Sequence, residues 1–317
     1  MTSVVTFSDI LEAACRIGPF IHRTPVLTCG ALDRASGARL FFKCENFQKV
    51  GVFKIRGATN AVSLLSEEEA PRGVATHSSG NHAAALAVAA RRRGVKAYVV
   101  MPRNAPGVKK EAVAGYGAEI IFCEPTLDSR ESTLADVMAR TGASLVHPYN
   151  DRRVIAGQGT AAMELCEETP GLDVVIAPVG GGGLVSGTAI AVNGMSPGTR
   201  VLAAEPERAD DACRSFRAGR IIPVEHPDTI ADGLRTSLGS LTFPVIREYV
   251  SDILTVSEDA IVSSMRLIWE RMKIVVEPSA AVPLAAILGH PGTFSGKRVG
   301  VILSGGNVDL DALPWVR

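Results

Sequence analysis

The sequence lacks an excess of either charge. Its 317 residues include 33 lysines and arginines and 33 aspartates and glutamates. Nucleic acids and anionic membrane surfaces attract strongly basic proteins, so we expect neither as a partner. Long apolar runs are also missing, because stretches such as 83–90 and 174–179 are far too short to cross a bilayer. No charged and then apolar leader precedes Phe7, and we therefore expect a cytoplasmic protein.

Paired cysteine motifs are absent as well. The six cysteines are scattered and none forms a CxxC pair, which is typical of reduced thiols in a cytoplasmic protein. Internal repeats and low-complexity linkers are missing too. A chain of this length exceeds the size of most single cores, so we expect one large domain and one smaller domain.

Short apolar runs alternate along the chain with longer helical segments. We expect strands over 40–44, 73–77, 97–101, 119–123, 174–179, 201–205, 253–256 and 298–303. We expect helices over 55–65, 81–93, 129–140, 154–168, 258–272 and 278–289. This alternation predicts an α/β fold in which helices cover both faces of parallel sheets. We interpret residues 67–146 as a small domain inserted in a large domain made of 1–66 and 147–317.

Four consecutive glycines, Gly180 to Gly183, separate the expected strand 174–179 from a helical stretch that begins at Leu184. Glycine loses more backbone entropy on folding than any other residue, so such a run requires a physical reason. A turn without side chains before a helix offers several backbone N–H groups to a phosphate. The turns 78–81 and 304–307 also follow expected strands. Ligands of parallel sheets bind at this edge, so the three turns indicate one shared crevice.

A dinucleotide site is the main alternative for the glycine run. Glu205 lies about twenty residues further on, where dinucleotide-binding folds place an acid for the ribose. However, the GxGxxG spacing fails, because the sixth residue is Val185 counted from Gly180 and Ser186 counted from Gly181. The lysine of a P-loop is missing as well. The run therefore favours a small terminal phosphate, and a dinucleotide-dependent oxidoreductase stays open as an alternative.

Lys54 is the candidate for covalent chemistry. It follows a glycine and two apolar residues where a loop enters the expected helix 55–65. An amine near a helix N-terminus and apolar neighbours is shifted toward its neutral, nucleophilic form, as a Schiff-base lysine must be. A solvated surface lysine is the alternative at this point.

These features resemble the fold-type-II, pyridoxal-phosphate (PLP)-dependent serine/threonine dehydratase family, and within it the serine racemase and 3-hydroxyaspartate dehydratase (ammonia-lyase) branches. The resemblance covers residues 24–315 and includes FFKCENFQKVGVFKIRGATNAV, THSSGNH, VHPYNDRRVIAGQGT, VGGGGL, AAEPERADDA, TIADGL, WERMKIVVEP and LSGGNVDL. It implies a tryptophan-synthase-β-like fold with two open, twisted, mostly parallel sheets. It also implies PLP as the cofactor, a small amino acid as the substrate and a homodimer.

The resemblance assigns the cofactor site residue by residue. Lys54 would hold PLP covalently and then act as base and acid on the substrate. Asn81 would bond the ring hydroxyl, and Ser304 would face the pyridine nitrogen with a neutral hydroxyl, which suits prompt β-elimination. The complete set is Phe53, Lys54, Asn81, Gly180, Gly181, Gly182, Gly183, Leu184 and Ser304.

The resemblance also assigns substrate contacts. Ser78, Ser79, Asn81 and His82 would bind the substrate carboxylate at a helix N-terminus, and Ser79 would face the side opposite Lys54 as a second proton carrier. A helix N-cap is the alternative for Ser79. Arg130 matches an arginine near the substrate and would pair with a β-carboxylate. A solvated position in the first turn of helix 129–140 is its alternative.

A cation site follows from the same resemblance. Racemase-like members hold a divalent cation with a glutamate, a backbone carbonyl four residues on and an aspartate two further. Glu205, Ala209 and Asp211 have this spacing. Oxygen ligands of this kind suit Mg²⁺ or Ca²⁺, and an exposed acidic loop is the alternative.

We therefore expect a PLP-dependent lyase that removes water from L-serine, L-threonine or 3-hydroxyaspartate and releases a 2-oxo acid and ammonia. Tyr149, where the animal racemases carry asparagine, favours the dehydratase. Racemisation of serine or an aspartate-type substrate at the same site is the alternative activity.

Overall fold

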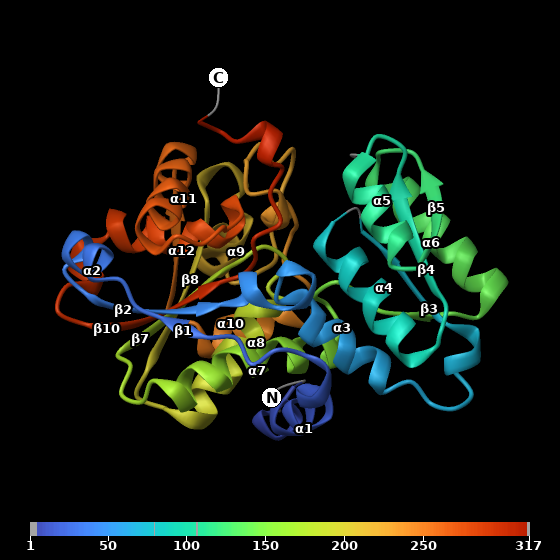
Figure 1. Ribbon diagram of the computed structural model, residues 1–317, viewed down its shortest axis with the longest axis horizontal. Helices are drawn as coiled ribbons and strands as arrows, with labels where there is room; N and C mark the ends of the chain where they lie inside the picture. The colour runs from blue at the N-terminus through green and yellow to red at the C-terminus, as the bar shows by residue number, and fades with distance from the viewer. Residues whose placement is uncertain (1–4, 79, 106, 316–317) are drawn as a thin grey trace.

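The computed structural model describes residues 5–78, 80–105 and 107–315, and its strands form two sheets (Figure 1). The larger sheet has the strand order β1-β2-β10-β7-β8-β9, and the smaller sheet has the order β5-β4-β3-β6. Every neighbouring pair is parallel except β1 and β2. The strands are β1 (Val26–Leu27), β2 (Arg39–Cys44), β3 (Val74–His77), β4 (Ala97–Pro102), β5 (Glu119–Cys123), β6 (Ser144–Leu145), β7 (Val174–Pro178), β8 (Arg200–Pro206), β9 (Asp252–Val256) and β10 (Arg298–Leu303).

Helices cover both faces of the larger sheet. Alternate residues of β7 point into two cores, with Val175 and Ala177 in one and Val174 and Ile176 in the other. The first core lies under α1 (Phe7–Ile17), α7 (Arg152–Glu168), α8 (Gly183–Met195), α9 (Asp211–Ala218) and α10 (Thr242–Tyr249). The second lies under α2 (Gly30–Ser36), α11 (Glu258–Met272), α12 (Pro278–Gly289) and α13 (Pro291–Phe294). Burial on both faces explains why the parallel strands are apolar throughout.

The smaller sheet is covered in the same way. Val99 and Met101 of β4 pack under α4 (Asn81–Arg93) and α5 (Gly107–Gly115), while Val100 packs under α6 (Leu127–Thr141). Helix α3 (Lys54–Ser63) contacts both α4 and α7, so it connects the two halves of the molecule (Figure 1). The first residue of α3 is Lys54, which therefore lies at this junction.

The α/β class expected from the sequence agrees with these sheets. Strands 119–123 and 298–303 and helices 81–93, 258–272 and 278–289 have the expected bounds, and the ends of the other expected elements differ by at most two residues. The sequence pattern did not predict β1 and β6, which have two residues each, or the helices α1, α2, α5, α9, α10 and α13. The domain limits 1–66, 67–146 and 147–317 stay a prediction.

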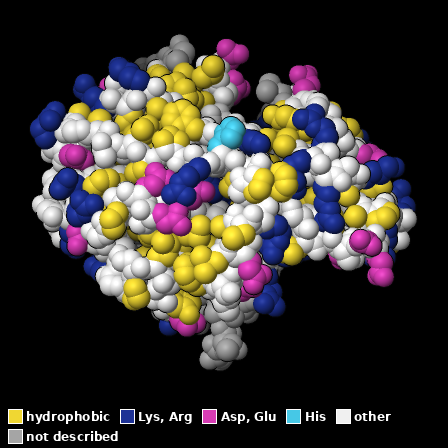
Figure 2. Space-filling view, turned by 60° about the horizontal axis from the view of Figure 1, so that its bottom comes forward, with side chains coloured by type: hydrophobic (Ala, Val, Ile, Leu, Met, Phe, Trp, Pro, Cys, Tyr) yellow, Lys and Arg dark blue, Asp and Glu magenta, His cyan; other side chains and the backbone are white. Residues whose placement is uncertain are grey.

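The surface agrees with the balanced composition. Figure 2 shows acidic and basic side chains interspersed over one face, with a hollow between two lobes. Within the described ranges no helix is both long and apolar enough to cross a membrane.

Candidate active site

Two of the three predicted turns meet through side-chain and backbone contacts. In the turn after β10, the carbonyl oxygen of Ser304 accepts a hydrogen bond from the N–H of Phe53 at 3.0 Å. The side chain of Asn307, in the same turn, donates to Oδ1 of Asn81 at 2.9 Å. Asn81 is the first residue of α4, directly after the turn that follows β3. These contacts bring the ends of β3 and β10 together, and we call the region between them the crevice; that all three turns share it stays a prediction.

Lys54 lies at this crevice with a partly desolvated amine. Its Nζ donates to the carbonyl oxygen of Pro148 at 2.8 Å and lies 5.1 Å from the centroid of the Phe53 ring. Desolvation lowers the pKa of Lys54 from 10.5 to about 8, while the charge of Glu277 acts in the opposite direction. A substantial fraction of this amine is therefore neutral near pH 8 and ready for nucleophilic attack.

The glycine run is crowded by its neighbours. A Cβ on Gly181 would lie 2.3 Å from ring carbons of Tyr149, and one on Gly183 would lie 2.9 Å from the Tyr149 Cβ. Gly182 has a φ of +90°, and a Cβ there would lie 2.8 Å from Thr242. Packing and backbone geometry thus require glycine at these positions, in addition to any ligand.

The same run leaves backbone donors available. Helix α8 begins at Gly183, and the first N–H groups of a helix have no partner inside it. Among the described residues, no carbonyl outside the helix accepts from the N–H groups of 180–184. A set of unpaired donors at the positive end of a helix is suited to a phosphate, so these residues fit the phosphate of PLP.

Asn81 contacts an unforeseen carboxylate, and Ser304 directly precedes Gly305, whose carbonyl oxygen accepts from the backbone N–H of the same residue, Glu277. Ser304 is buried at the end of β10. Nδ2 of Asn81 donates to Glu277, at 3.1 Å from Oε1 and 3.0 Å from Oε2. Glu277 was not among the residues predicted from the sequence. One signal was available, namely an acidic residue directly before Pro278 at the start of an apolar helix.

Three of the four residues predicted to bind the substrate α-carboxylate are among the described residues. The hydroxyl of Ser78 lies 3.4 Å from the Gly80 N–H, and Ser79 lies outside the described residues. His82 is buried, with Nε2 at 3.0 Å from the Val146 carbonyl oxygen. Desolvation, followed by the charge of Lys54, lowers the pKa of His82 to about 3, so its ring is neutral and donates to Val146. The role of His82 in carboxylate binding stays a prediction.

Arg130 is close enough to a row of aromatic rings for its charge to act on His77. Its Nε is buried without a hydrogen-bond partner among the described residues. Burial, and to a smaller extent the charge of Arg130, lowers the pKa of His77, while Glu131 raises it. His77 and His147 are 6.1 Å apart between ring centroids, and His147 and Tyr149 are 4.6 Å apart. This row connects Arg130 with the glycine run, and nothing in the sequence pattern indicated it.

The proposed cation ligands are buried together. Glu205 on β8 accepts from the N–H groups of Ala212 and Cys213, at 3.2 and 2.6 Å. Asp211 is 1 % exposed, and its Oδ2 has no partner in the described structure. Burial raises the pKa of Glu205 to about 9 and that of Asp211 to about 7. Both groups are therefore inconsistent with an exposed acidic loop. In the described ranges no group of three or more His, Cys, Asp or Glu side chains is arranged so that it could hold a metal ion.

A buried ion network holds α3. The Arg56 guanidinium makes five hydrogen bonds to Glu45, Glu164 and the Thr160 hydroxyl, between 2.7 and 3.1 Å. Lys43 pairs with Glu164 at 2.7 Å, so two cations balance two carboxylates. Every Arg56 donor has a partner, which compensates for burying its charge. The network fixes α3 two residues after Lys54.

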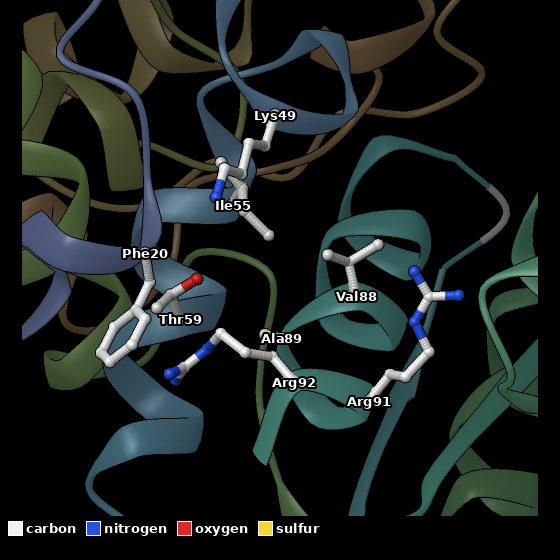
Figure 3. Close-up of a pocket in the computed structure, with 8 residues that line it drawn as sticks. All are labelled: Phe20, Lys49, Ile55, Thr59, Val88, Ala89, Arg91 and Arg92. Carbon is white, nitrogen blue, oxygen red and sulfur yellow. The ribbon is translucent and has the colours of Figure 1, made fainter. Parts of the chain in front are cut away.

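A separate cavity of about 280 Å³ lies between α3 and α4 (Figure 3). Three of its lining residues, Lys49, Arg91 and Arg92, are cations, and none is a carboxylate. It contains none of the predicted cofactor or substrate residues, so it is distinct from the crevice at Lys54.

Known proteins resemble this chain over most of its length. Residues 17–305 match the family model described as pyridoxal-phosphate-dependent enzyme. The chain is 57% identical over 312 residues to β-hydroxyaspartate dehydratase of Paracoccus denitrificans, covering 98% of this chain and 99% of that protein. It is 51% identical over 310 residues to serine racemase of Oryza sativa, covering 96% and 91%.

Solved structures give the same result. Serine racemase from Dictyostelium discoideum superimposes with a TM-score of 0.93 at 51% identity, covering 96% of this chain and 99% of that one. The T.th. threonine deaminase superimposes with a TM-score of 0.92 at 48% identity, with the same coverage. The chain therefore belongs to the family of pyridoxal-phosphate-dependent enzymes. The predicted fold-type-II architecture is confirmed, and the dinucleotide-dependent alternative is set aside.

Proposed function

We propose that this enzyme is a dehydratase that releases a 2-oxo acid and ammonia from a β-hydroxy amino acid. The observation that carries this proposal is the partly neutral Lys54 amine, held at the crevice by the carbonyl of Pro148. Loss of the α-proton and the β-hydroxyl releases water and leaves an enamine. Water then hydrolyses the corresponding imine to the 2-oxo acid and ammonia.

The residues of the crevice fit PLP. The N–H groups of 180–184 would hold its phosphate, Lys54 its aldehyde carbon, Phe53 and Asn81 its ring, and Ser304 its nitrogen. Bound PLP supplies an electron sink for the electron pair left at the α-carbon. Lys54 is suited to take the α-proton near neutral pH and to return a proton to the leaving hydroxyl, because its pKa is about 8.

Arg130 supports 3-hydroxyaspartate among the possible substrates. Its buried Nε lacks a partner among the described residues, and a substrate β-carboxylate would supply one. The relative from Paracoccus denitrificans carries the name β-hydroxyaspartate dehydratase. Serine and threonine are also proposed substrates. For all three substrates the α-carboxylate would be bound by Ser78, Ser79, Asn81 and His82.

Racemisation at the same site is the second candidate activity. It needs a proton carrier on each face of the α-carbon, and we assign these roles to Lys54 and Ser79. The serine racemases that are about half identical to this chain support this candidate.

We further infer a bound Mg²⁺ or Ca²⁺ at Glu205, Ala209 and Asp211. The unpaired Oδ2 of Asp211, within the described part of the chain, and the two buried carboxylates support it.

A homodimer is supported by exposed apolar Phe47 and Val275, whose segments are joined by the Asn46 side chain. A cytoplasmic location is supported by the six cysteines, all of which are free.

An assay of the purified enzyme with PLP tests the proposed function. Serine, threonine and 3-hydroxyaspartate are each supplied, and 2-oxo acid and ammonia are measured together with the chirality of the remaining substrate. We expect 2-oxo acid and ammonia in equal amounts from at least one of them. Racemisation without release of 2-oxo acid would favour the second candidate, and no turnover of any substrate would contradict both.

A further inference from the structure

Glu277 is a buried carboxylate at the crevice to which the predicted site gives no role. Its side chain lies directly before α12 and is 2 % exposed as a residue. Its backbone N–H donates to the carbonyl oxygen of Gly305 at 3.0 Å, and a Cβ on Gly305 would lie 3.0 Å from Oε1. The carboxylate is therefore fixed against the turn that follows β10. Burying a charge of this kind is costly, which calls for a function.

The partners of Asn81 fix the orientation of its amide. Glu277 accepts from Nδ2, and Asn307 donates to Oδ1 at 2.9 Å. The other N–H of Asn307 donates to the Val50 carbonyl oxygen at 2.9 Å, so Asn307 is itself held. Turning the Asn81 amide by half a turn would place donor against donor and oxygen against carboxylate.

One donor of Asn81 remains available in this arrangement. Both contacts with Glu277 run from the same nitrogen to the two oxygens of one carboxylate. A single N–H shared between the two oxygens accounts for them, and the amide nitrogen carries a second N–H. This second donor is the one that a ring hydroxyl of PLP requires.

We propose that Glu277 is a positioning residue that acts through Asn81 and keeps one amide N–H of Asn81 available to the ring hydroxyl of PLP. The inference rests on the role of Asn81 in the proposed function. Glu277 touches neither substrate nor ring in this account. Because Asn81 starts α4 while Glu277 and Asn307 flank the larger sheet, the orientation is set only when the two halves of the molecule meet.

The test compares PLP affinity among variants of this chain. Glu277→Gln keeps the shape of the side chain, but its amide can donate as well as accept, so Asn307 becomes the remaining partner that orients the Asn81 amide. We expect PLP to bind about tenfold more weakly to Glu277→Gln and to Asn81→Ala. In the double variant the loss should equal that of Asn81→Ala alone, because Glu277 acts through Asn81. Affinities are measured by titrating the protein freed of PLP and following visible absorbance.

Two comparisons separate this role from a purely structural one. Asn46→Ala removes a hydrogen bond to Val275 in the same loop without touching Asn81, and it should bind PLP like the parent protein. Thermal unfolding without PLP shows whether Glu277→Gln folds. If it does not, Asn307→Ala replaces it at an exposed position and should weaken PLP binding at least about threefold.

The PLP affinities separate a failure of this inference from a failure of the proposed function. Unchanged PLP affinity in Glu277→Gln, or losses that multiply in the double variant, would overturn the inference and leave the proposed function intact. If Asn307→Ala is used instead, an unchanged PLP affinity would likewise overturn the inference and leave the proposed function intact. Unchanged affinity in Asn81→Ala would overturn the role of Asn81 and the inference together. No binding of PLP by the parent protein would contradict the proposed function itself.

Discussion

The Nζ atom of Lys54 and the carbonyl oxygen of Pro148 are 2.8 Å apart. This hydrogen bond links the first turn of α3 to the segment that follows β6. It holds the amine inside the crevice, where desolvation lowers its pKa to about 8. The reactive group is therefore in position before the cofactor arrives.

Capture of PLP by the protein freed of cofactor should depend on this pKa. Only the neutral amine attacks, so the rate should rise with pH to a plateau, with a midpoint of about 8 rather than 10.5. Stopped-flow absorbance at several pH values measures it, with Lys49→Ala as a control that retains the profile. A rate that continues to rise toward pH 10.5 would contradict the desolvated amine.

Gly181→Ala should disturb both folding and cofactor binding. The added Cβ would overlap the Tyr149 ring, and overpacking of this kind costs about 1–3 kcal/mol. Thermal unfolding and PLP titration measure the two effects. Gly198→Ala is the matched control, because no atom lies within 4 Å of a Cβ there. Equal behaviour of the two variants would show that Tyr149 does not restrict the run.

Arg130→Ala should alter substrate choice. Losing a charged hydrogen bond to the β-carboxylate should lower kcat/KM for 3-hydroxyaspartate at least about tenfold more than for serine. Arg140→Ala, in the last turn of the same helix, serves as the control. Equal losses with both substrates would remove the argument for β-carboxylate recognition.

Adding Mg²⁺ or Ca²⁺ to chelator-treated protein should raise its Tm by roughly 3 °C or more, because an ion that binds only the folded state stabilises it. Asp211→Asn should abolish the increase. Asp210→Asn, which removes a surface pair with Arg214 and is not one of the proposed ligands, should retain it. An identical Tm with and without either ion would exclude this site.

Local patterns predicted much of the fold and the site. The buried parallel strands follow from short-range features, which also singled out the glycine run and Lys54, namely residue type, strand ends and helix starts. The roles of the site residues came from the family resemblance and stay predictions. Glu277 did not follow, because its bond to Asn81 joins residues 196 positions apart. Tyr149 against Gly181 is likewise a tertiary contact, visible only when α7 and α8 pack together.

The burial and ion pairing of Arg56 could not be predicted from the local sequence either. An arginine in the first turn of a helix normally extends into solvent, but this one is fully buried. Its partners Glu45 and Glu164 lie 11 and 108 residues away, so no local window contains the network. Strands β1 and β6 were not predicted, because a strand of two residues is too short to show a periodic hydrophobic pattern.

The visible spectrum of the enzyme with and without Lys54 tests the central claim most directly. The parent protein and Lys49→Ala should show the absorbance of lysine-bound PLP after removal of free cofactor. Lys54→Ala should lack it and release 2-oxo acid about 10²–10⁴-fold more slowly. A parent protein that stays colourless with PLP, or a Lys54→Ala variant with an unchanged spectrum and rate, would contradict the account.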